Sequence, residues 1–173
     1  MDENERMKVI LETLTASMEV YRQTTNSSTS TGEEGSNDDD ITNESMTTEL
    51  SVLLLELRDI VEQIDYARAF CALQGLPFLL GCIQEQSLVP RSIRAACLGI
   101  LATVCQNNPP VQLQLLELGS IRILSDLFFE ESTTSTTSSM LQAKIVQAMS
   151  ANVRNHDMAE HVFCQVPQAT QLM

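Results

Sequence analysis

Tryptophan is absent from the sequence, and aromatic residues together make up only 4% of its 173 residues. Apolar residues nevertheless account for 43%, which is enough for a buried core. With so few aromatic rings, that core must be built mainly from aliphatic side chains. The composition therefore favours an interior of packed helices.

Basic residues are also scarce: 10 lysines and arginines stand against 23 aspartates and glutamates, which gives a formal net charge of −13. A chain of this charge is a poor partner for nucleic acid or for an anionic membrane, because both are bound through a basic face. The acidity is uneven, since residues 1–49 hold 12 acids and 3 bases, whereas residues 50–173 hold 11 acids and 7 bases. Most of the negative charge therefore lies in the N-terminal region.

Signals for a membrane span or for secretion are missing. No apolar run approaches the ~20 residues of a membrane-spanning helix, and the N-terminus, MDENERMKVILETL, carries acids where a signal peptide begins with basic residues. The odd number of cysteines and the absence of a Cys-x-x-Cys pair favour small buried side chains over disulfides or metal ligands. These cysteines are Cys71, Cys82, Cys97, Cys105 and Cys164. We expect a monomer of the cytoplasm, or of cytoplasm and nucleus, without signal peptide, metal or cofactor.

Motifs of catalysis are lacking as well. The glycine-containing stretch TGEEG has no lysine and so is not a phosphate-binding loop. His156 and His161 are five residues apart and do not share a helix face. No set of Ser, His and Asp residues can be assigned to a catalytic triad from its spacing in the sequence. We therefore expect that the protein is not an enzyme.

The N-terminal region divides into two parts. Within residues 1–22, apolar side chains recur at three- and four-residue steps and predict an amphipathic helix, which either docks weakly on the body of the protein or detaches to bind something apolar. Residues 23–48 are polar and acidic, and they carry too few large apolar groups to offset the entropy of ordering. We predict a disordered acidic linker there.

From residue 49 onward the pattern is one of successive apolar helices. Their stripes recur with helical spacing and are separated by glycine, asparagine and proline, which end helices. The predicted helices span residues 50–64, 65–75, 76–86, 93–104, 111–118, 120–131, 140–155 and 158–167.

One joint between these helices recurs. Asn107 ends a long helix before Asn-Pro-Pro, and Asn155 ends another before His-Asp, 48 residues later. Gly75 and Gly119 close shorter helices 44 residues apart. A period in the forties, with a short, a medium and a long helix in each unit, is typical of armadillo or HEAT repeats. We predict an all-α, right-handed superhelical solenoid of about two and a half repeats over residues 49–173.

The stretches ELRDIVEQIDYARAFCALQGLPFLL and GILATVCQNNPPVQLQLLELGSIRIL resemble the armadillo-type nucleotide exchange factors of the heat shock protein 70 chaperones, the Fes, Sil and Hsp70-binding-protein group. The likeness covers roughly residues 50–160, and its motifs appear in order at Leu57–Asp65, Gln106–Pro109 and Asn152–His156. It implies a cochaperone that binds the chaperone's ATPase domain with the inner face of the solenoid and promotes ADP release. The family has about four repeats, and Pro167 stands where a glycine is expected. The chain therefore looks truncated at its C-terminus.

The resemblance also suggests contact residues. In three-helix repeats the third, long helix lines the concave face, and its outward positions here are Thr103, Gln106, Asn107, Gln147, Arg154 and Asn155. The alternative interpretation is that the asparagines are helix caps and that Arg154 is a solvated side chain. By the same resemblance, the N-terminal segment would engage the chaperone's substrate-binding side and help to discharge clients, through Met7, Ile10, Leu11 and Leu14.

Two other functions remain open on the sequence alone. An armadillo adaptor, like a catenin or an importin, would hold an extended peptide without exchange activity. Such grooves use ladders of tryptophan and asparagine, whereas this chain has no tryptophan and a short groove. A purely structural scaffold is the third possibility. A measurement of ADP release from a chaperone would separate the exchange factor from the adaptor and the scaffold.

Overall fold

The computed structural model describes residues 2–28, 37–134 and 139–167, and these residues form nine helices and no strand. The predicted all-α class is confirmed, and each predicted helix corresponds to one observed helix. The helices are α1 (Glu3–Ser28), α2 (Asn37–Val61), α3 (Ile64–Ala72), α4 (Gly75–Gln84), α5 (Arg91–Cys105), α6 (Pro109–Glu117), α7 (Ser120–Thr134), α8 (Ser139–Val153) and α9 (Asp157–Gln165).

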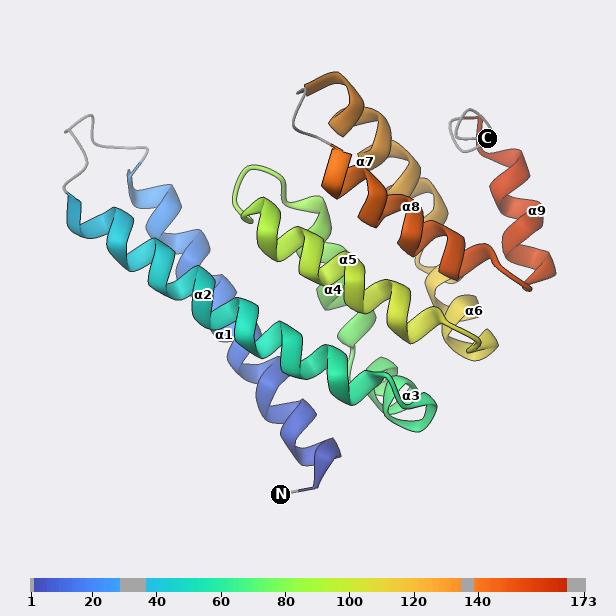
Figure 1. The fold of residues 1–173 in the computed structure, drawn as a ribbon, viewed down its shortest axis with the longest axis horizontal. Coiled ribbons are helices and arrows are strands. Elements are labelled where there is room, and N and C mark those ends of the chain that lie inside the picture. Colours follow the sequence, from blue (N-terminus) through green and yellow to red (C-terminus); the bar gives the residue numbers. More distant parts are fainter. Residues whose placement is uncertain (1, 29–36, 135–138, 168–173) are drawn as a thin grey trace.

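The three helices α2, α5 and α8 lie side by side and run in the same direction (Figure 1). Behind this layer, α4 contacts α5 and α7, and α1 packs against α2. The short helices α3, α6 and α9 each follow a long helix. Of these three, α3 contacts α6, and α6 contacts α9. Each of the segments α3–α5 and α6–α8 thus begins with a helix of 9 residues and ends with a helix of 15 residues, whereas the middle helix has 10 residues in α4 and 15 in α7.

Left-handed backbone marks the joints between these helices. The positive φ angles in the described part of the chain belong to Gln74 (63°), Asn107 (54°), Gly119 (74°) and Asn155 (57°). Asn107 and Asn155 follow the ends of the long helices α5 and α8, as predicted from the sequence. Asparagine and glycine tolerate this conformation better than most residues. The joints therefore recur in backbone conformation as well as in sequence.

The sequence predicts that Gly75 closes α3, and this prediction is wrong. The left-handed residue is Gln74, and Gly75 begins α4. The reason for a glycine here is packing. A Cβ atom at Gly75 would lie 2.3 Å from the ring of Phe70, which is fully buried. The glycine lets the two helices approach at this turn.

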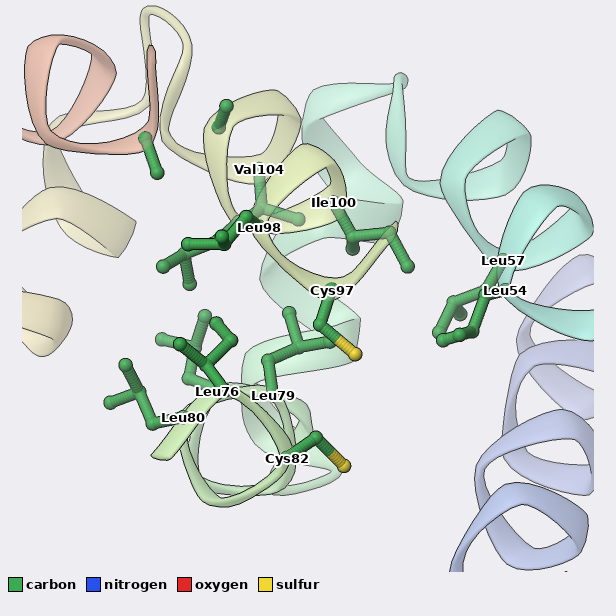
Figure 2. Close-up of a cluster of buried hydrophobic side chains, with 14 of the residues drawn as sticks. Leu54, Leu57, Leu76, Leu79, Leu80, Cys82, Cys97, Leu98, Ile100 and Val104 are labelled. Carbon is green, nitrogen blue, oxygen red and sulfur yellow. The ribbon is translucent and has the colours of Figure 1, made fainter. Parts of the chain in front are cut away.

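The core is continuous and mainly aliphatic. Leucines of α2, α4 and α5 gather around the buried face of α5 (Figure 2). The sulfurs of Cys82 and Cys97 lie among them, and all the cysteines are free thiols. Burial raises the pKa of Cys71 to about 11, so this thiol stays protonated and unreactive. The predicted burial of the cysteines is confirmed for four of them and wrong for Cys164, which is exposed on α9.

Within the described residues, no single helix is long and apolar enough to cross a membrane. The pair α3 and α4 reaches the required length and composition only together, and the two helices are bent by 77° at their joint. Their apolar side chains, such as Phe70 and Leu79, are buried in the core.

The N-terminal helix is docked rather than detached. Met7, Ile10, Leu11 and Leu14 are buried against the rest of the core. These side chains are therefore not displayed on a tether, as their predicted role in client release requires, and that role would need α1 to leave α2. The structure favours the first alternative, a helix that packs on the body.

Two ion pairs reinforce this docking. The guanidinium of Arg6 donates to both carboxylate oxygens of Glu56 on α2, at 2.5 and 2.7 Å. Near the other end of α1, the guanidinium of Arg22 donates to both oxygens of Glu85, which follows α4, at 2.7 and 2.6 Å. Because Arg6 favours the charged form, it lowers the pKa of Glu56. Helix α1 is thus held by one ion pair to α2 and by another to the end of α4.

Helices reach into both ends of the region over residues 23–48, which the sequence predicts to be a disordered linker. Helix α1 continues to Ser28 and α2 begins at Asn37, whereas residues 29–36 lie outside the described part. The helix extends upstream of the apolar stripe of α2 because Met46 still packs against the core. A helix that is already nucleated by tertiary packing propagates into neighbouring polar residues at little cost.

Candidate protein-binding cleft

A cleft of about 660 Å³ opens along the C-terminal halves of α2, α5 and α8. Five of the six residues predicted for the concave face line it, and they come from two segments far apart in the sequence. These are Thr103, Gln106, Asn107, Gln147 and Arg154. The sixth, Asn155, is exposed but does not line the cleft.

The ends of α5 and α8 determine how these side chains are presented. Gln106 follows the last residue of α5, and the left-handed turn at Asn107 then redirects the chain into α6. Arg154 and Asn155 occupy the corresponding positions after α8. The asparagines therefore act as helix terminators, as the alternative interpretation held, while Gln106 and Arg154 project as exposed polar groups.

Asn108 does not cap a helix with its side chain. This residue is at the N-cap of α6, but its buried side-chain amide makes no hydrogen bond within the described part of the chain. At the equivalent position before α9, Nδ1 of His156 accepts a hydrogen bond from the backbone N–H of Ala159 at 3.2 Å. Only the second joint thus has a side-chain cap.

Gln112 of α6 holds the end of α8 in place. Its side chain is buried, and its Nε2 lies within hydrogen-bond distance of three carbonyl oxygens at the end of α8, those of Ala151 (2.9 Å), Asn152 (3.2 Å) and Arg154 (2.9 Å). These carbonyls are among those that a helix C-terminus leaves without an intrahelical partner. Gln112 therefore positions the backbone from which Arg154 reaches into the cleft.

Arg58 and Glu62 are among the cleft residues that were not predicted from the sequence. Arg58, on α2, and Glu62, which directly follows that helix, form part of the wall opposite α8. The prediction of contact residues used only the long helices that end at the recurring joint, and the helix over residues 50–64 is not one of them. The signal was present, however, because α2 has an apolar stripe like that of α5 and its outward residues therefore face the same side.

The cleft is lined mainly by polar side chains that can make hydrogen bonds. Its polar groups are guanidiniums, amides and hydroxyls with a single carboxylate, and neither histidine nor cysteine lines it. The hydroxyl of Thr103 already donates to the carbonyl of Gly99 at 3.0 Å. In the part of the chain that the structure describes, no group of three His, Cys, Asp or Glu side chains is placed to hold a metal ion.

Comparisons with known proteins give no family assignment: no protein-family model matches the chain, and no curated protein matches it significantly. The motifs of the sequence and the geometry of the cleft are therefore the basis for a function.

Proposed function

We propose that this protein is a cochaperone that binds the ATPase domain of a heat shock protein 70 chaperone and promotes the release of ADP. In this proposal, α3–α5 and α6–α8 are armadillo-like repeats, α9 begins a third, and the whole forms a right-handed superhelical solenoid. The layer of α2, α5 and α8 would be its inner, concave face. The repeated helix order and the recurring left-handed joints support this architecture.

The observation that carries the proposal is the convergence of Gln106 and Arg154 on one cleft. The two residues were selected from the sequence because they occupy equivalent positions in successive units and fall within the motifs that resemble the exchange factors. They are 48 residues apart in the chain, and no local feature would bring them together. A surface assembled in this way suits a protein partner better than a small substrate.

The proposed mechanism is a shift of population in the chaperone. A partner that binds the open form of the ATPase domain more tightly than the closed form moves the equilibrium by the ratio of the two affinities. The nucleotide cleft then spends more time open, and ADP leaves faster. The cochaperone itself makes and breaks no covalent bond.

The test is the release of a fluorescent ADP analogue from a purified cytosolic heat shock protein 70. We expect the full chain to accelerate release, and we expect Arg154→Ala to reduce the acceleration at subsaturating protein. Arg68→Ala, at an exposed arginine of α3 outside the cleft, is the matched control and should behave like the wild type. An unchanged release rate at high concentrations of folded wild-type protein would refute the proposal.

A further inference from the structure

The groove along α2, α5 and α8 has a charge opposite to that of the whole chain. Beside the 660 Å³ cleft lies a second hollow of about 270 Å³ between the same helices, and Arg58 lines both. Lys144 lines the second hollow and Arg154 the first. Neither α5 nor α8 contains an aspartate or a glutamate, and Glu62 is the single acid among the residues that line the two hollows. Three cations thus converge on one face of a protein whose net charge is −13.

These cations are not used in holding the fold. In the described residues, neither Arg58 nor Arg154 makes an ion pair, and the Nζ of Lys144 donates a long hydrogen bond, at 3.4 Å, to the amide oxygen of Gln147. Five other arginines do pair with carboxylates: Arg6, Arg22, Arg91, Arg94 and Arg122. With acids in more than twofold excess over bases, cations left unpaired on one face point to carboxylates supplied from outside.

Apolar side chains accompany the cations. Leu55, in the second hollow, is 59% exposed, and Ile64, at the edge of the first, is 47% exposed. Large apolar groups exposed next to charged groups are typical of sites that bind another protein. A ligand that complements this face would therefore carry both carboxylates and apolar side chains.

We infer that this groove binds an acidic amphipathic segment of a partner protein, whose carboxylates meet Arg58, Lys144 and Arg154 and whose apolar side chains cover Leu55 and Ile64. The inference rests on the proposed function for the use of this face in docking, and it adds the chemistry of the segment that is bound. A nucleic acid is the poorer occupant, because its dense phosphates would be repelled by the net negative chain and would gain only three cationic contacts.

The experiment uses the full chain and measures fluorescence anisotropy with a fluorescein-labelled helical peptide that carries glutamates and leucines on one face. We expect binding that weakens as salt is added, because exposed charge pairs are screened. The double variant Arg58→Ala/Arg154→Ala should bind about tenfold more weakly. The control double variant Lys8→Ala/Arg68→Ala removes the same charge from exposed positions outside the groove and should bind like the wild type.

Three results would overturn the inference. The first is equal affinity for a peptide in which glutamines replace the glutamates, the second is equal weakening in the control double variant, and the third is tighter binding of a single-stranded oligodeoxynucleotide than of the acidic peptide. Circular dichroism of each variant verifies that it remains folded.

This measurement contains no chaperone, so its outcome is separable from that of ADP release. Peptide binding with no effect on ADP release would refute the exchange function and leave the acidic-segment site standing. Accelerated ADP release without peptide binding would refute the site alone.

Discussion

Replacing Gln112 tests whether one buried amide holds α6 to the end of α8. Gln112→Met keeps the length and approximate volume of the side chain but removes both N–H donors. Gln112→Glu is nearly isosteric and replaces the amide nitrogen, which donates to the carbonyl oxygens, with a carboxylate oxygen, which can only accept. Because the side chain is only 2% exposed, water cannot easily replace the lost hydrogen bonds.

The magnitude follows from the geometry. A single amide nitrogen has two hydrogens for three carbonyls, so at most two full hydrogen bonds form at a time. Two of the three contacts are partly accessible and the contact with Asn152 is buried. With a net loss of about 1 kcal/mol for each hydrogen bond, and more where an acceptor stays dry, Gln112→Met should lower the free energy of unfolding by about 2 kcal/mol. Gln112→Glu leaves a buried carboxylate among carbonyl oxygens and should cost about 3–5 kcal/mol at neutral pH.

The assay is urea denaturation followed by circular dichroism, with Gln114→Met and Gln114→Glu as controls. Gln114 lies on the same helix but is exposed, so its variants should stay within about 0.5 kcal/mol of the wild type. Part of the loss in Gln112→Glu should be recovered at acidic pH, where a protonated carboxyl can donate again. If Gln112→Met and Gln114→Met are equally stable, the carbonyl contacts do not stabilise the end of α8, and the reasoning fails.

Two further predictions concern packing and pH. Gly75→Ala places a methyl group against an aromatic ring and should destabilise the protein by about 1–3 kcal/mol, whereas Gly81→Ala, where nothing lies within 4 Å of the new Cβ atom, should stabilise it by about 0.5–1 kcal/mol; thermal denaturation of both variants decides, and equal effects would contradict the packing argument. Glu56 has a lowered pKa in the folded protein, so its contribution to stability is complete above the usual glutamate pKa of about 4.3 and is lost as the pH falls through the lowered value. The difference in stability between wild type and Glu56→Gln should therefore be present at neutral pH and vanish in acid, as urea denaturation at several pH values would show; a difference that persists in acid would assign it to another cause.

The helices of this protein could be predicted from the sequence because their stripes are long and their ends are marked chemically. Asn107 and Asn155 end helices through a backbone preference that is local to each residue, and the structure confirms it at both positions. The recurrence of that joint also selected Gln106 and Arg154, which line one cleft. Features determined within a few residues of one another were thus accessible to sequence analysis.

Features that depend on what packs against a segment were not accessible. The stripe of α1 indicated that one face is apolar, but not that α2 covers it. The polar composition near Met46 suggested disorder, whereas contact with the core extends the helix. Arg58 was missed because its role depends on the position of α2 beside α5, which no local pattern reports.

The packing of α1 against α2 has a consequence for truncation experiments. Arg6 pairs with Glu56, two residues before Arg58 on α2, and the buried stripe of α1 covers the other side of that helix. Deleting the N-terminal helix would therefore remove the contacts that hold α2, which forms one wall of the groove. An N-terminal deletion that loses activity would then report a disturbed docking face, and point substitutions on α1 are the way to assign a task to the helix itself.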